Sequence, residues 1–160
     1  MEDELIKAAN DVLIACRARK WMVATAESCT GGMVAAALTE IAGSSDVVNR
    51  GYVTYTNEAK HEMIGVPMAL FETVGAVSEG VARAMAEGAM RAAGVDLACG
   101  ITGVAGPGGG SPEKPVGLVH IAAASADQTV HEKYLFDGDR HAIRLAAAIK
   151  ALEMLKALAE

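Results

Sequence analysis

The chain has 160 residues, enough for one folded domain of ordinary size and short for two. Apolar residues make up 52% of it and exclude a disordered chain, while a formal net charge of −6 argues against a protein that coats nucleic acid. No apolar run approaches the ~20 residues needed to cross a bilayer, and residues 1–5 are acidic where a signal peptide would be basic. We therefore expect a cytoplasmic protein with no membrane and no nucleic-acid partner.

Short apolar runs typical of buried strands alternate with segments whose apolar residues recur at helical spacing. Only 4% of the residues are aromatic. In chain order the patterns predict a helix at 4–19, a strand at 22–26, a helix at 33–41, a strand at 47–56, a short helix at 57–63, a long helix capped by Ser78 and ending near 93, strands at 95–101, 116–125 and 129–136, and a last helix from about 139. Residues 64–77 and 102–115 are predicted to be loops, and Asn57 to cap the short helix. This interleaving favours a layered α/β domain with a mixed sheet, in which small side chains let helices lie close to the strands.

Cysteines and histidines are few and scattered. The three cysteines form no Cys-x-x-Cys motif, and their odd number argues against a disulfide framework. The four histidines match no metal-binding spacing, so no structural zinc site is expected.

The first candidate for chemistry is the glycine-bearing turn at 27–32, between the first strand and the second helix. Ser28 lies in this turn, and ligands of open α/β sheets bind beyond the carboxyl ends of the strands. The free N–H groups at the start of a helix serve an anion or a serine nucleophile equally well. The alternative is that Ser28 or Thr30 only caps the helix.

A serine nucleophile needs a base, and no histidine has an obvious supporting acid nearby in the sequence. Lys60 could act as that base if burial or a nearby cation lowered its pKa from ~10.4 toward ~7–8. Tyr55, five residues earlier, could relay a proton. Taken alone, these two residues are better explained as a solvated charge and a packed ring with a satisfied hydroxyl.

Two further segments could contact a ligand. The glycine-rich segment 100–115 follows a strand, and its backbone amides could face a phosphate or an oxyanion. It lacks both the Walker pattern and the Gly-x-Gly-x-x-Gly pattern, so the common nucleotide sites are disfavoured. Arg140, at the entry to the last helix, could hold a phosphate. A flexible loop, and an Asp139 cap beside an exposed Arg140, are the alternatives.

Taken together, these segments resemble the CinA carboxy-terminal domain family over nearly the whole chain. The matching motifs are AESCTGG at 26–32, RGYVTYTNEAK at 50–60, GAVS at 75–78, TGVAGP at 102–107, EKPVG at 113–117 and GDR at 138–140. The resemblance implies a three-layer α/β/α sandwich with a mixed sheet, formed by residues 1–160 as a single domain. It also implies a homo-oligomer without metal or cofactor.

That family includes stand-alone nicotinamide mononucleotide deamidases, which release ammonia from the carboxamide of this nucleotide in pyridine nucleotide salvage. The resemblance therefore implies an amidohydrolase with a small-molecule nucleotide substrate. It implies Ser28 as nucleophile and Lys60 as base, and Tyr55 and Thr102 complete the expected catalytic cluster. The residues expected around the substrate are Glu27, Cys29, Thr30, Gly31, Asn57, Gly103 and Arg140. The alternative is a non-catalytic module that binds a nucleotide in the same place.

Overall fold

The computed structural model describes all 160 residues and is built around one five-stranded sheet. The strands are β1 (Val23–Glu27), β2 (Val48–Val53), β3 (Leu97–Gly103), β4 (Leu118–Ser125) and β5 (Thr129–Leu135), and their order across the sheet is β2-β1-β3-β4-β5. β1 pairs in parallel with both β2 and β3, whereas β4 pairs antiparallel with β3 and with β5. The sheet is therefore mixed, with a parallel half and an antiparallel half.

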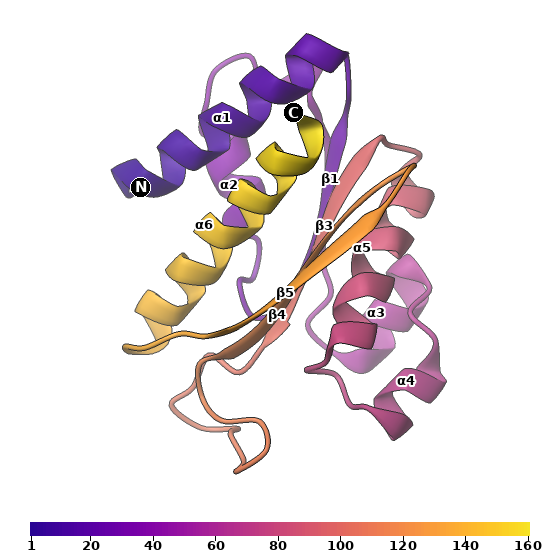
Figure 1. Ribbon diagram of the computed structural model, residues 1–160, viewed down its shortest axis with the longest axis vertical. Coiled ribbons are helices and arrows are strands. Elements are labelled where there is room, and N and C mark those ends of the chain that lie inside the picture. The colour runs from indigo at the N-terminus through magenta and orange to yellow at the C-terminus, as the bar shows by residue number, and fades with distance from the viewer.

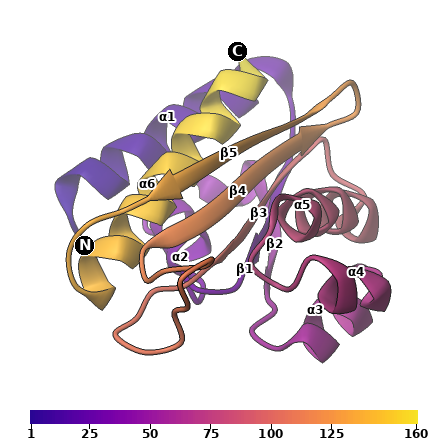
Figure 2. The same ribbon diagram turned by 60° about the horizontal axis from the view of Figure 1, so that its bottom comes forward.

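Helices cover both faces of the sheet (Figures 1 and 2). One face carries α1 (Asp3–Arg19), α2 (Met33–Thr39) and α6 (Arg140–Ala159), and the other carries α3 (Asn57–Ile64), α4 (Met68–Thr73) and α5 (Glu79–Ala93). A short 3-10 helix, Ser44–Asp46, leads into β2. The predicted three-layer α/β/α sandwich with a mixed sheet is confirmed. No helix combines the length and apolar character needed to span a membrane.

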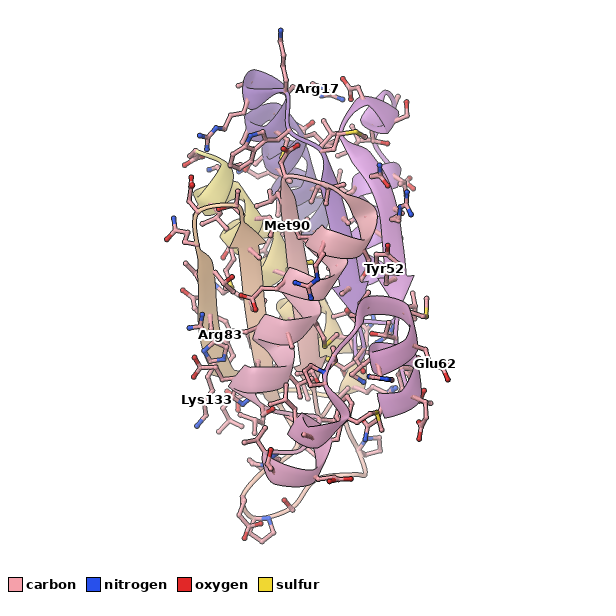
Figure 3. The ribbon with its side chains drawn as sticks, turned by 90° about the vertical axis from the view of Figure 1, so that its right-hand side faces the viewer. Arg17, Tyr52, Glu62, Arg83, Met90 and Lys133 are labelled. Atoms are coloured by element: carbon pink, nitrogen blue, oxygen red, sulfur yellow. The ribbon has the colours of Figure 1, made fainter.

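The two faces have different cores. Large side chains such as Leu5, Leu13 and Leu152 fill the space between the sheet and the helices α1, α2 and α6. On the other face α5 lies close to the middle of the sheet, with Tyr52 of β2 and Lys133 of β5 toward the two edges (Figure 3). A Cβ atom at Gly100 of β3 would lie 2.6 Å from the backbone nitrogen of Ala86 in α5, so glycine is needed for this close approach.

Three sequence-based expectations were wrong in detail. Residues 64–77 are not all loop, because α4 forms within them after Pro67, whose φ of −60° suits a helix start. Its six residues are too few to show a helical period. The cap of α3 is Thr56, whose hydroxyl accepts the Ala59 N–H, and not Asn57. β3 also continues through Thr102 and Gly103, which were expected in the following loop.

The strand directions bring several candidate residues to one edge of the sheet. β1, β2 and β3 are parallel, so their carboxyl ends lie at the same edge. Ser28 directly follows β1, Tyr55 comes two residues after β2, and Thr102 lies near the end of β3. This is the edge at which ligands bind in open α/β sheets.

Candidate active site

A pocket of about 210 Å³ lies at this edge. It is lined by Ser28, Cys29, Tyr55, Asn57, Lys60, Ala76, Val77, Thr102, Gly103, Ala105 and Arg140. Residues from the ends of all three parallel strands, from α3 and from the start of α6 thus meet in one place. Glu27, Thr30 and Gly31 are the expected site residues that do not line it.

Ser28 and Lys60 contact one another inside this pocket. The Nζ atom of Lys60 donates a hydrogen bond to the Oγ atom of Ser28 at 3.2 Å and a second one to the backbone oxygen of Tyr55, also at 3.2 Å. The residues are only 8% (Ser28) and 2% (Lys60) exposed. The Ser28 backbone is fixed to the neighbouring strand, because its N–H donates to the Ile101 carbonyl.

The surroundings of Lys60 favour a neutral amine. Burial lowers its pKa below the ordinary lysine value, and a weaker interaction with Cys29 acts in the opposite direction. No carboxylate forms an ion pair with Nζ. A neutral amine beside a hydroxyl is the arrangement that general-base activation of a serine requires.

Cys29 follows Ser28 and also lines the pocket. Burial raises the pKa of its thiol to about 11, so the sulfur stays protonated at neutral pH. Its backbone N–H donates to no protein oxygen. The residue after a nucleophile often supplies such an N–H to a developing oxyanion.

Glu27 and Thr30 lie beneath the Ser28 turn and contact each other. The buried Glu27 carboxylate accepts hydrogen bonds from the Thr30 hydroxyl at 2.7 Å and from the N–H groups of Val34 and Ala35 at 2.9 and 3.1 Å. It therefore satisfies the free donors at the start of α2, where a negative charge is also favoured. Both side chains support the turn from outside the pocket.

The turn itself requires glycine. Gly31 and Gly32 have φ values of +58° and +100°, a left-handed conformation that favours glycine. The Gly31 N–H closes the turn by donating to the Ser28 carbonyl at 3.0 Å. Gly31 thus shapes the segment that carries Ser28 without lining the pocket.

The remaining candidates form the pocket wall. The Arg140 guanidinium donates to the Tyr55 hydroxyl at 3.3 Å and to the Gly106 carbonyl at 2.7 Å. Thr102 donates its hydroxyl hydrogen to the Ala76 carbonyl at 2.8 Å. Asn57 and Gly103 also line the wall. Asp139 does cap α6, by accepting the Ala142 N–H, so the cap and the pocket-lining arginine occur together.

Arg144 is a neighbour of the site that the sequence analysis did not identify. Its guanidinium donates to the backbone oxygens of Cys29 and Thr30 at 2.9 and 3.1 Å. The only sequence signal is its position four residues after Arg140, which places both side chains on one face of α6. Ala76, Val77 and Ala105 were also missed, because small apolar wall residues carry no chemical signature.

No group of three His, Cys, Asp or Glu side chains is placed to hold a metal ion, and the three cysteines are free and buried. The fold and the pocket together define an α/β protein of three layers with a buried serine–lysine pair at the carboxyl edge of its parallel strands. The chain belongs to the CinA C-terminal domain family, whose model matches residues 5–159. The predicted family membership is confirmed.

Two relatives show the extent of the sequence similarity. The nicotinamide-nucleotide amidohydrolase PncC of Enterobacter agglomerans is 48% identical over 153 residues, which cover 95% of this chain and 93% of that protein. A CinA-like protein of Anaeromyxobacter dehalogenans is 54% identical over 139 residues, or 87% of this chain. The chain spans only about a third of such longer CinA-like relatives, with 34% and 33% of their length covered in two of them.

Solved structures show the same fold. The competence/damage inducible protein CihA from Agrobacterium tumefaciens has a TM-score of 0.97 and 48% sequence identity, with 100% of this chain and 98% of that chain covered. A CinA superfamily protein from Escherichia coli has a TM-score of 0.93 at 33% identity, with 99% and 93% covered.

Proposed function

We propose that this protein is an amidohydrolase that converts nicotinamide mononucleotide to nicotinic acid mononucleotide and ammonia, as a step in pyridine nucleotide salvage. The proposal rests above all on the 3.2 Å contact between Lys60 Nζ and Ser28 Oγ in a buried pocket. The name of the Enterobacter agglomerans relative supports the nucleotide amide as substrate.

In the first step, neutral Lys60 accepts the hydroxyl proton of Ser28 while Oγ attacks the carboxamide carbon. The carbonyl π electrons move to oxygen, and the resulting oxyanion is bound by the N–H of Cys29 or by a backbone donor at Gly103. Loss of one such donor typically raises the barrier by ~2.7–4 kcal/mol. The intermediate then collapses, the carbon–nitrogen bond breaks, and the Lys60 ammonium returns its proton to the departing ammonia.

In the second step, water hydrolyses the serine ester. Lys60 accepts a proton from the water, the hydroxyl oxygen attacks the ester carbon, and Ser28 leaves and regains a proton from Lys60. The products are the nicotinate carboxylate and the free enzyme. This sequence needs no redox partner, because each step transfers only a proton or an acyl group.

The other wall residues bind and orient the substrate in this proposal. Arg140 supplies a positive charge for the substrate phosphate. Because the chain has a net charge of −6, positive charge has to be concentrated at the pocket to bind an anion. Tyr55, whose hydroxyl contacts Arg140, assists proton transfer at the mouth of the pocket. Thr102 fixes the segment around Ala76 through its hydrogen bond, while Asn57 contacts the pyridine amide or the ribose.

A homo-oligomeric assembly is part of the proposal. Tyr55 and Val53, at 61% and 48% exposure, leave apolar surface beside the pocket that a second copy would cover. Sedimentation of the intact protein tests this, since a monomer at micromolar concentration would exclude it.

The test of function is ammonia release from nicotinamide mononucleotide. We expect turnover by the wild type and a loss of at least about 1,000-fold in Ser28→Ala, because the nucleophile is absent. Ser125→Ala is the matched control, since Ser125 is comparably buried, at 7% exposure, and lies outside the pocket. Wild-type turnover by Ser28→Ala would contradict the nucleophile assignment. Tight nucleotide binding without ammonia release by the wild type would favour the non-catalytic module.

A further inference from the structure

We propose that Arg144 is a positioning residue for this reaction. Its guanidinium holds the turn that carries Ser28, so that Oγ stays within reach of Lys60 and the Cys29 N–H stays available to the oxyanion. The inference rests on the proposed function, because it assigns Arg144 a role in the same serine chemistry.

The contacts of Arg144 are unusual for an arginine. Nε donates to the Cys29 carbonyl at 2.9 Å, and a terminal nitrogen donates to the Thr30 carbonyl at 3.1 Å. The side chain is half-buried and forms no ion pair. Arginine normally directs its fork of donors to a carboxylate or phosphate. Here both of its hydrogen bonds go to main-chain oxygens one and two residues beyond the nucleophile.

The turn needs a side chain that holds its backbone in place. We call the two hydrogen bonds from Arg144 to the Cys29 and Thr30 carbonyls the brace. Gly31 and Gly32 are the most flexible residue type, and they immediately follow the two braced carbonyls. The Glu27 carboxylate holds the other side of the segment, but it contacts the Thr30 hydroxyl and the start of α2 instead of the backbone next to Ser28. Arg144 alone among the side chains fixes the peptide groups directly after Cys29.

Helix α6 couples this brace to the pocket. Arg140 and Arg144 are four residues apart and extend from one face of the first turns of α6, one into the pocket and one onto the turn. Ile143 and Ala147 are buried in the core and anchor the helix in this register. A Cβ atom at Gly31 would lie 3.2 Å from the Arg144 guanidinium, so the brace also depends on glycine at that position.

Arg17 offers a matched control at the opposite end of the sheet (Figure 3). Its guanidinium donates to the Gly43 carbonyl at 3.0 Å and to the Asp46 carboxylate at 2.9 Å. Like Arg144, it holds a turn that contains a left-handed glycine, but no pocket residue is involved. Comparing Arg17→Met with Arg144→Met therefore separates a loss of stability from a loss of positioning.

The experiment measures kcat and KM for nicotinamide mononucleotide together with the Tm of each variant. We expect Arg144→Met to lower kcat by about 100-fold, the effect of a misplacement near 1 Å, with KM within about threefold of wild type. Arg144→Lys should recover part of kcat, and guanidinium ion at a non-denaturing concentration should partly restore Arg144→Ala but not Ser28→Ala. Arg17→Met should lower Tm and leave kcat unchanged.

The inference would be overturned if Arg144→Ala kept kcat within twofold of wild type while Ser28→Ala was inactive. A loss confined to KM would also overturn it, since Arg144 would then act in substrate binding. If Arg144→Met fails to fold, the Lys variant and the guanidinium rescue of Arg144→Ala decide the question. Full activity of Ser28→Ala would instead contradict the nucleophile assignment, and absence of ammonia release by the wild type would contradict the proposed function itself.

Discussion

Strand β3 separates two buried groups of titratable side chains with different surroundings. On its parallel side, Lys60 contacts Ser28 in the pocket. On its antiparallel side, His120 is paired with Thr102 across the sheet and contacts His131, with 2.9 Å between Nδ1 and Nε2. Burial lowers the pKa of both Lys60 and His120. Only Lys60 also faces a pocket and a hydroxyl, so the two groups share a lowered pKa but differ in what they contact.

The histidine pair is closed off by its neighbours. The two rings stack with their centroids 5.1 Å apart, and His131 lies 3.7 Å from the Glu79 carboxylate at the start of α5. Neither histidine lines the pocket. The pair therefore satisfies buried polar atoms in the antiparallel half without contacting a reacting group.

The largest expected effect tests the base in the parallel half. Lys60→Met keeps a long side chain but removes the amine, so kcat should fall by about 1,000-fold, within the range for loss of a general base. Lys133→Met on β5 is the control, and its kcat should match wild type because Lys133 is exposed and outside the pocket. Steady-state ammonia release measures both. Comparable kcat values for the two variants would contradict the assignment of Lys60 in the parallel half as the base.

The histidine pair should affect stability instead of turnover. Folding lowers the His120 pKa from 6.5 to about 4, first through burial and then through His131, with smaller lowering effects from Lys133 and Lys114 and a weak opposing effect from Glu79. Between pH 6.5 and 4, the unfolded chain therefore binds more protons at His120 than the folded protein does. The free energy of unfolding keeps its full value above pH 6.5 and decreases as the pH falls toward 4. The loss amounts to roughly 3 kcal/mol.

Urea unfolding between pH 7.5 and 4 measures this loss. His120→Gln should show a smaller decrease in unfolding free energy than wild type, while His141→Gln should show the wild-type decrease, because His141 is exposed and pairs with Glu2 at the surface. Carboxylate titration affects all three proteins alike. A decrease in His120→Gln equal to that of wild type would show that the pair does not stay neutral in the folded state.

Activity should depend on pH through Lys60. Its lowered pKa means that kcat/KM rises with pH about tenfold per unit until the amine is neutral, and levels off below the ordinary lysine value. The acid limb should persist in His120→Gln, since that residue does not face the substrate. A kcat/KM that does not change with pH in the wild type would contradict the role of Lys60. An acid limb that shifts in His120→Gln would assign the titration to another group.

Sequence reasoning located Ser28, the serine that lines the pocket, because its signal is local. The strand, glycine turn and helix around Ser28 can be predicted from neighbouring residues, and Lys60 was a candidate base that the motif resemblance then favoured. The brace by Arg144 could not be predicted, since it joins residues 115 apart through main-chain oxygens, which have no sequence signature. The support given by Glu27 also depends on which way one buried carboxylate points. Among the α-helices and strands, only α4 was missed, because its six residues have no apolar period.

The smallest effects are expected when two glycines are replaced by alanine. One glycine lies in the turn of the parallel half, and the other lies in the loop that leads into the antiparallel half. Gly31→Ala should lower the unfolding free energy by about 1–2 kcal/mol, because alanine is strained at a φ of +58°. It should also lower kcat about tenfold through displacement of Arg144, since a 1 Å shift costs up to about 100-fold. Gly108→Ala should change stability by less than about 0.5 kcal/mol, because a Cβ there meets no atom within 4 Å. Urea unfolding and ammonia release measure both variants, and equal effects would mean that neither the left-handed backbone of Gly31 nor its proximity to Arg144 matters.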